Sequence, residues 1–187
     1  MKLLLASKSP RRRQLLSELG FPIDFIALDV DEHVSPTLPA ALTAEHLACR
    51  KAAACPADSI GEDEVLIAAD TVVVHRNHVM GKPANRDEAL AMLRNLQGDS
   101  HEVYTGVCLR SHTQQKSFTE KTIVTFCPLN EKELEYYVDT YRPYDKAGAY
   151  GIQEWIGMVG VSGIQGCYYN VMGLPVARVY EELKKFF

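Results

Sequence analysis

The sequence predicts an α/β protein in which a mixed β-sheet is flanked by helices. Short apolar runs and amphipathic stretches interleave along the chain, without the strict strand-helix-strand rhythm of a doubly wound fold. Two long segments, 102–109 and 118–126, alternate apolar and polar residues. Such alternation is typical of antiparallel neighbours, so a purely parallel sheet is not expected.

The first half of the chain contains strands and helices with recognisable ends. A helix is expected to begin at Pro10, because proline suits the first helical turn, and to stop at Gly20. The expected elements are a strand at 3–6, a helix at 10–19, a strand at 25–28, a helix at 42–54, a strand at 65–74 and, after a turn, a short strand within 76–83.

Capping signals mark the helices of the second half. Asn85 is followed three residues later by Glu88, and Asn130 by Glu133, which is the pattern of a capping box. The expected elements are a helix from Asn85 to Leu96 stopped by Gly98, strands at 102–109 and 118–126, a helix from Asn130 to Asp139, and a last helix from Pro175 to the end.

Composition narrows the functional classes. The 187 residues, 47% hydrophobic and 24% charged, predict a single domain spanning 1–187. A net charge of -4 argues against nonspecific binding to nucleic acid or anionic membrane, and no run approaches the ~18 apolar residues of a membrane span. We therefore expect a cytoplasmic protein. Five scattered cysteines favour reduced thiols, and the six histidines are expected at the surface or in loops.

A basic cluster lies where the first helix should begin. It consists of Ser7, Ser9, Arg11, Arg12 and Arg13. A helix N-terminus repels cations and favours anions, so this placement costs stability unless an anion binds there. Hydroxyls, backbone N–H groups and guanidinium groups together can bind phosphate. A solvated basic turn is the alternative, and the local sequence leaves both interpretations open.

Acidic residues form the second pattern. Asp70 interrupts the apolar run VLIAADTVVV, and an ionised carboxylate inside a strand is costly unless it is paired or bound to metal. The alternative is an aspartate satisfied by local hydrogen bonds. The step Asp29, Asp31 and Glu32 can hold a hard divalent cation together with substrate phosphates, although taken alone it is better explained as a solvated loop.

Two glycine-containing segments complete the candidates. GKP at 81–83 holds Lys82 between a permissive glycine and a stiff proline, and it is not a Walker A loop. DKAGAYGIQ at 145–153 combines small residues with Gln153, whose amide can recognise a base edge by paired donor and acceptor. A plain glycine-rich surface loop is the alternative for the second segment.

Together these segments resemble the Maf family of nucleotide pyrophosphatases over nearly the whole chain. The stretches that carry the resemblance are LASKSPRRRQLL (5–16), the acidic step at Glu32, LACRKA (47–52), AADTVV (68–73), GKP (81–83), YTGV (104–107), DKAGAYGIQ (145–153) and YYNVMGLP (168–175). Their common order and spacing make the resemblance specific. One departure is Cys167, which stands where the family often has serine.

The resemblance implies a Maf/ITPase-like α/β fold with two lobes and a central cleft. It also implies hydrolysis of nucleoside triphosphates to the monophosphate and pyrophosphate, with Mg²⁺ or Mn²⁺ as cofactor. The DKAGAYGIQ version is similar to the branch acting on dTTP and UTP, with modified pyrimidine nucleotides as further candidates. A house-cleaning role and a role in cell-division arrest follow by association. The alternative is a non-catalytic nucleotide-binding regulator of septum formation.

The resemblance also assigns roles to residues. Asp70 is the expected proton acceptor that activates water, and Glu32 with Asp70 the expected metal neighbours. Arg11, Thr71 and Gln153 occupy positions associated with substrate selection. The implied substrate-binding residues are Ser7, Ser9, Arg11, Arg12, Lys51, Thr71, Lys82 and Gln153, with Arg13 assigned to the surface. The expected partner is a nucleoside triphosphate, and a homodimer packed through Phe186 and Phe187 stays open.

Overall fold

The structure, a computed structural model, describes residues 2–28, 30–31, 33 and 38–186. Its elements are β1 (Lys2–Ala6), α1 (Pro10–Ser17), β2 (Ile23–Ile26), α2 (Ala40–Ala53), β3 (Glu64–His75), β4 (His78–Met80), α3 (Arg86–Leu96), β5 (Ser100–Arg110), β6 (Gln115–Phe126), α4 (Glu131–Tyr141), α5 (Trp155–Gly160), β7 (Val161–Gln165), α6 (Tyr168–Met172) and α7 (Val176–Leu183). Single 3₁₀ turns lie at Ala57–Ser59, Ala147–Ala149 and Lys184–Phe186.

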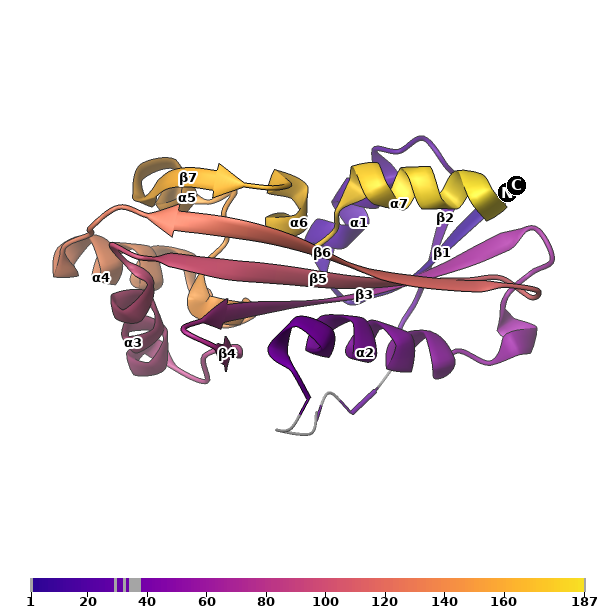
Figure 1. Cartoon of the computed structure of the whole chain (residues 1–187), viewed down its shortest axis with the longest axis horizontal. Helices are drawn as coiled ribbons and strands as arrows, with labels where there is room; N and C mark the ends of the chain where they lie inside the picture. Colours follow the sequence, from indigo (N-terminus) through magenta and orange to yellow (C-terminus); the bar gives the residue numbers. More distant parts are fainter. Residues whose placement is uncertain (1, 29, 32, 34–37, 187) are drawn as a thin grey trace. The chain divides into compact units, whose positions relative to one another are not determined.

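The strands of the described chain form one seven-stranded sheet in the order β2-β1-β3-β5-β6-β7, with β4 paired to β3. β1 is parallel to both β2 and β3, whereas β4 runs antiparallel to β3 and β7 antiparallel to β6. The sheet is therefore mixed and carries helices, which confirms the predicted fold class (Figure 1).

The chain divides into two compact units, and β3, β5 and β6 contribute residues to both. Unit 1 comprises residues 1–70, 105–120 and 173–187, and unit 2 comprises 71–104 and 121–172. Each unit thus combines segments that are distant in sequence. The interpretation of 1–187 as a single domain stays a prediction.

In unit 1, helix α2 packs closely on the sheet. Ala48 and Ala52 of α2 are buried with Leu66 and Ala68 of β3 in one apolar cluster. A Cβ atom on Gly106 of β5 would lie 2.2 Å from main-chain atoms of Ala44 and Glu45, so only glycine permits this approach. The small residues of the YTGV and LACRKA segments therefore bring α2 against the strands.

Unit 2 has its own core, formed by α3 and α4 packed on buried residues of β3, β5 and β6. The predicted caps are confirmed: the Asn85 side chain accepts the Glu88 N–H at 3.0 Å, and Asn130 with Glu133 forms a complete capping box. Both helices end close to their predicted limits because these local signals depend on nearby residues alone.

Several predicted boundaries were wrong. The second strand is Ile23–Ile26, two residues earlier than expected, because its register is set by pairing with β1. Helix α1 ends at Ser17, before Gly20. The short elements α5, β7 and α6 were not predicted, since their glycines and brief length give no clear periodicity.

Two histidines correct the expectation that all six lie at the surface or in loops. His75 and His101 are buried in strands of unit 2. Nε2 of His75 is 3.0 Å from Oδ2 of Asp99, and Nε2 of His101 is 2.7 Å from the Tyr150 hydroxyl. Polar partners supplied by the tertiary fold allow this burial.

Among the helices that the structure describes, none combines the length and the apolar composition that a membrane-spanning helix requires.

Candidate functional site

Asp70 and Lys51 form an ion pair in unit 1. Nζ of Lys51 lies 2.5 Å from Oδ1 of Asp70, and both side chains are mostly buried, at 16% and 14% exposure. Asp70 lies on β3 and Lys51 on α2, the helix that packs closely against the sheet at Gly106. The costly strand carboxylate is therefore paired, which excludes the alternative that local hydrogen bonds alone satisfy it.

Arg12 connects the start of α1 to the strand that carries Asp70. Its Nε donates to the carbonyl of Gly173 at 2.7 Å, and its Nη1 donates to the carbonyl of Ala69 at 2.9 Å. Ala69 directly precedes Asp70. A guanidinium group has five N–H donors, so these bonds still allow Arg12 to bind an anion. Arg12 thus brings together the basic turn, the Asp70 strand and the YYNVMGLP segment.

Helix α1 begins with two serines that bond to the turn itself. Oγ of Ser7 accepts the N–H of Ser9 at 3.1 Å, and Ser9 is the N-cap of α1, accepting the N–H of Arg12. The first turn of α1 contains no acidic residue. Arg13 is exposed, as expected, with its guanidinium 4.7 Å from the centre of the Phe25 ring.

The acidic step near residue 31 is only partly within the described residues. Asp29 and Glu32 lie outside them, so the predicted metal role of Glu32 has no structural description. Asp31 is exposed and lies 3.6 Å from Nη2 of Arg50. A hydrogen bond from the main chain of His33 lowers the pKa of Asp31. The described part of this step is therefore a solvated loop with an ion pair to α2.

In unit 2, two predicted segments lie side by side. The Gly148 N–H donates to the carbonyl of Gly81 at 3.0 Å, which joins the 145–153 loop to the GKP segment that carries Lys82. Gly148 has φ +70°, and a Cβ there would lie 3.1 Å from the Val73 side chain. Glycine therefore suits the left-handed backbone conformation and avoids a tight contact with Val73.

Gln153 has the feature expected of a ligand-recognising group. Its Oε1 atom is buried and accepts no hydrogen bond from the described residues. A buried amide oxygen without a donor is destabilising, and such atoms are rare in native proteins. The arrangement suits a ligand that supplies an N–H group. Thr71, the other predicted selection residue of unit 2, follows Asp70 directly in β3.

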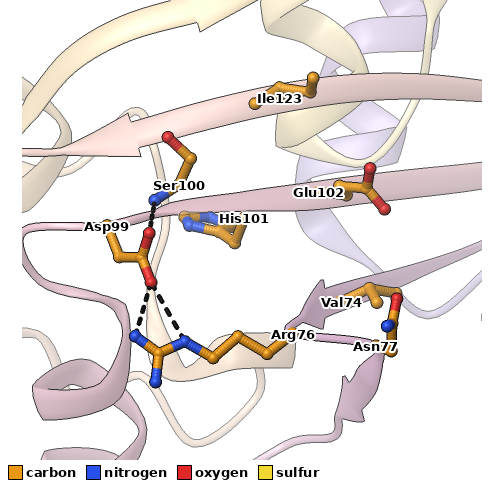
Figure 2. Close-up of a pocket in the computed structure, with 8 residues that line it drawn as sticks. All are labelled: Val74, Arg76, Asn77, Asp99, Ser100, His101, Glu102 and Ile123. Carbon is orange, nitrogen blue, oxygen red and sulfur yellow. Dashed lines mark hydrogen bonds and ion pairs between the residues drawn. The ribbon is translucent and has the colours of Figure 1, made fainter.

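A separate pocket of about 460 Å³ lies in unit 2 (Figure 2). It is lined by Val74, Arg76, Asn77, Asp99, Ser100, His101, Glu102 and Ile123. Figure 2 shows Asp99 between Arg76 and Ser100. The Asp99 carboxylate accepts hydrogen bonds from Nη2 of Arg76 at 3.0 Å and from the Ser100 N–H at 2.8 Å. The lining includes none of the predicted site residues, and we do not assign the pocket to the site.

Among the described residues, no three His, Cys, Asp or Glu side chains are grouped so as to share a metal ion. Mg²⁺ commonly binds one or two carboxylates together with substrate phosphates rather than a cage of protein ligands. The mostly buried carboxylate of Asp70 fits that mode.

Cys167, the departure from the family pattern, is held through its main chain. Its N–H donates to Oγ1 of Thr122 at 3.1 Å, and its carbonyl accepts from the same hydroxyl at 3.1 Å. Asn170 Nδ2 also donates to this Oγ1, at 3.0 Å. The segment is thus fixed by Thr122 irrespective of the residue 167 side chain.

Sequence reasoning missed several groups that support the site residues. They are the carbonyls of Ala69 and Gly173, the carboxylate of Glu154 and the hydroxyl of Tyr137. Backbone carbonyls have no residue signature, and Tyr137 belongs to the buried face of α4, where an aromatic residue suggests only packing. Glu154, adjacent to Gln153, was the one member detectable as a polar residue beside a predicted site.

The fold and the site residues define a class of protein. It is an α/β protein in which a basic strand-to-helix turn is hydrogen-bonded through Arg12 to the strand that carries the ion-paired Asp70. Residues 2–186 match the family described as Maf-like protein. The chain belongs to the Maf family, which confirms the resemblance found in the sequence.

Several relatives of this chain share a name. The dTTP/UTP pyrophosphatase of Phocaeicola vulgatus is 51% identical, covering 98% of this chain and 95% of that protein. The dTTP/UTP pyrophosphatase of Porphyromonas gingivalis is 44% identical, covering 99% and 94%. Among solved structures, the Staphylococcus aureus Ham1 protein has a TM-score of 0.46 and 14% identity, covering 67% of this chain and 72% of that one.

Proposed function

We propose that this protein hydrolyses dTTP and UTP to the nucleoside monophosphate and pyrophosphate. The observation that carries the proposal is the paired Asp70 carboxylate, which Arg12 connects to the basic turn at α1. Relatives that are 44–51% identical over nearly their full length are named dTTP/UTP pyrophosphatase, which supports the same activity here.

The proposed reaction is attack of water on the α-phosphorus. Asp70 accepts the proton of the water, the new P–O bond forms, and the bond from the α-phosphorus to the bridging oxygen breaks so that pyrophosphate leaves. The triphosphate carries a charge of about -4, which the protein must stabilise. The residues proposed to hold it are Ser7, Ser9, Arg11, Arg12, Lys51 and Lys82.

Lys51 has a position suited to two tasks. In the structure it donates to Asp70, so it keeps this carboxylate oriented. An ammonium group has three donors and can bond to a phosphate oxygen while it contacts the carboxylate. We propose that Lys51 bridges Asp70 and the triphosphate. Lys51 would then hold the negatively charged triphosphate close to the Asp70 carboxylate that activates water.

Base selection is proposed to depend on Gln153. Thymine and uracil present an N3–H donor flanked by carbonyl oxygens, and the buried Oε1 of Gln153 is an acceptor that can receive it. Cytosine lacks a hydrogen on N3, so it would leave this oxygen unsatisfied. Arg11 and Thr71 are proposed to assist the selection, as the family resemblance implies. Modified pyrimidines that keep N3–H would be accepted on the same grounds.

A divalent cation, Mg²⁺ or Mn²⁺, is proposed as cofactor. Asp70 and Glu32 would hold it together with the triphosphate oxygens. When bound, such an ion neutralises phosphate charge and polarises the phosphorus centre. The protein's own contribution is to orient Asp70 through Lys51 and the strand through Arg12.

The test is product identification across a nucleotide panel. Purified protein is incubated with Mg²⁺ or Mn²⁺ and dTTP, UTP, CTP, ATP, GTP, 7-methyl-GTP or a modified pyrimidine triphosphate, and products are separated by anion exchange. We expect monophosphate and pyrophosphate from dTTP and UTP. Orthophosphate with diphosphate, or no turnover, would contradict the proposal. Tight binding without turnover would instead favour a nucleotide-binding regulator of septum formation.

A further inference from the structure

In unit 2, a buried tyrosine hydroxyl forms hydrogen bonds to two residues that lie on either side of Gln153 in the sequence. Tyr137 of α4 is fully buried, and its hydroxyl accepts the N–H of Gly151 at 3.0 Å. The same hydroxyl donates to Oε2 of Glu154. Gly151 lies two residues before Gln153 and Glu154 follows it, so α4 holds the chain at both ends of a four-residue segment.

The Glu154 carboxylate, which accepts the hydrogen bond from Tyr137, also forms an ion pair. Oε1 of Glu154 lies 3.1 Å from Nζ of Lys146, whose side chain is only 9% exposed. Nζ of Lys146 also lies 2.8 Å from Oδ1 of Asp145. A buried ammonium needs such compensation, so the ion pair with Lys146 helps to hold the Glu154 carboxylate in place. We call Tyr137, Glu154 and Lys146 the tyrosine brace.

The direction of the hydrogen bonds in the brace is defined. Burial, together with the hydrogen bond to Glu154, raises the pKa of Tyr137. The hydroxyl therefore stays protonated at neutral pH and donates to the carboxylate, while its oxygen accepts from Gly151. The hydroxyl thus donates one hydrogen bond and accepts another, and a buried polar network with satisfied members is typically rigid.

The Gln153 amide is packed against the braced segment. A Cβ atom on Gly151 would lie 3.0 Å from Nε2 of Gln153 and 2.9 Å from the carboxyl carbon of Glu154. The amide is thus confined beside Gly151, with its Oε1 buried and without a donor among the described residues. A small displacement of Gly151 or Glu154 would move this oxygen.

We propose that the tyrosine brace positions the Gln153 amide and so sets the selectivity for bases with an N3–H donor. This inference rests on the proposed function of Gln153 and extends it to residues that do not touch the base. Hydrogen-bond selectivity depends on the geometry of the acceptor, because a buried polar group that is misaligned is nearly as costly as one without a partner. Tyr137, Glu154 and Lys146 are positioning residues.

A merely structural network would behave differently. Loss of the Tyr137 hydroxyl would then lower the melting temperature and affect all nucleotides alike. A positioning network changes the ratio between nucleotides that differ in N3–H, and it acts through Gln153. Selectivity and its dependence on Gln153 therefore separate the two roles.

The principal variant is Tyr137→Phe, which removes only the hydroxyl and keeps the ring stacked on Tyr141, 5.1 Å away between ring centres. Turnover of UTP and CTP is measured for each protein, together with binding of their non-hydrolysable α,β-methylene analogues. We expect the preference for the uracil nucleotide to fall about tenfold, mainly through KM, with kcat for UTP within about threefold. Unchanged preference would overturn the inference.

The matched control is Tyr141→Phe. Tyr141 lies on α4 as Tyr137 does, and its ring stacks on the ring of Tyr137. The Tyr141 hydroxyl has no hydrogen-bond partner among the residues that the structure describes. It should keep the preference of the original protein. An equal loss in Tyr141→Phe would show that packing of α4, rather than the hydroxyl, is responsible, and would overturn the inference.

The decisive comparison uses Gln153→Ala. In that background Tyr137→Phe should produce no further loss of preference, whereas additive losses would show that the hydroxyl acts elsewhere and would contradict the proposal. If Tyr137→Phe is unfolded at the assay temperature, Glu154→Gln takes its place, with the same expected loss.

Failure of the inference is distinguishable from failure of the proposed function. Turnover of UTP by the original protein tests the function alone. Binding of the non-hydrolysable analogues tests the brace even when no turnover occurs, since base preference is present in binding. Turnover with unchanged preference in Tyr137→Phe would refute the brace and leave the function standing.

Discussion

The predicted site residues of the two units differ in how their charges are balanced. In unit 1, Lys51 pairs with the carboxylate of Asp70, and Arg12 donates to the main-chain carbonyls of Gly173 and Ala69. In unit 2, one buried cation, Lys146, contacts two carboxylates, those of Asp145 and Glu154. The turn at the start of α1 thus carries three consecutive arginines with no acidic residue in the first turn of the helix, whereas the buried cation beside Gln153 has two carboxylate partners.

This difference indicates separate tasks. A cluster with excess positive charge is stabilised by a bound anion, which suits the triphosphate and the reacting water. A balanced and buried network maintains its geometry without a ligand, which suits recognition of the base. The comparison thus predicts that changes at Lys51 and Asp70 lower the rate of reaction, while changes around Gln153 alter the choice of substrate.

Asp70→Asn should have the largest effect. The amide keeps the size of the side chain but cannot accept a proton from water, so pyrophosphate release from dTTP should fall by about 10² to 10⁴. Release is measured with a coupled phosphate assay, and thermal unfolding serves as the control for folding. If the variant remains active, the proton acceptor is another group and the division of tasks between the units is wrong.

Gly106→Ala should destabilise unit 1 strongly. The new Cβ would lie 2.2 Å from the main chain of α2, and relief of this overlap must shift the helix that carries Lys51. We expect a loss of about 3 kcal/mol in the free energy of unfolding. Urea denaturation measures it.

Gly163→Ala is the matched change in unit 2. The nearest atom to its Cβ, Cβ of Thr125, would lie 3.9 Å away, an ordinary contact distance, so a change of about 0.5 kcal/mol or less is expected. A similar cost at both positions would show that close helix packing at Gly106 is not what distinguishes unit 1.

The buried His101 of unit 2 should make stability depend on pH. Burial, with a smaller effect of His75, lowers the pKa of His101 from its ordinary value of 6.5 to about 4. Between these values the unfolded chain binds a proton that the folded chain does not, so stability falls as pH drops from 6.5 towards 4. At pH 5 the loss relative to pH 7.5 should be about 2 kcal/mol.

His101→Phe removes this titration and keeps an aromatic ring beside Phe126, whose ring centre is 5.2 Å away. The difference in unfolding free energy between the original protein and the variant should therefore shrink as pH falls from 7.5 to 5. Denaturant unfolding at the two pH values measures it. A difference that is constant with pH would show that His101 titrates normally in the folded state.

Arg94→Ala should have the smallest effect. Arg94 pairs with Glu131 between α3 and α4, but both side chains are about half exposed. Water and salt screen such pairs, so only a slight decrease of the melting temperature is expected, and it should become smaller in high salt. A large decrease would mean that exposed pairs, and not only the buried Lys146 network, hold unit 2 together.

Much of the fold could be predicted because its signals are local. The caps at Asn85 and Asn130 were identified from residues three positions apart, and both are present. Asp70 was recognised because a carboxylate in an apolar strand must have a partner, and that argument requires no tertiary contact. The Maf family followed from the order of its motifs.

The undetected parts of the fold and of the candidate site depend on distant contacts. Strand β7 has two small residues among five and is defined by its pairing with β6 rather than by any periodicity. The burial of His101 depends on Tyr150, 49 residues away. No short segment of the sequence contains both members of such a pair. Residue propensity and hydrophobic periodicity therefore cannot predict that either residue is buried against the other.

The amino-acid sequence alone determines the residue types of the site, since arginine, lysine, aspartate and glutamine each have the charge or donor pattern that their predicted role requires. The tertiary structure decides which groups meet: Arg12 with the carbonyl of Gly173, 161 residues away, and Tyr137 with the segment around Gln153. The physical reason is that a main-chain carbonyl is present in every residue, so only its position in space distinguishes the one that accepts a bond.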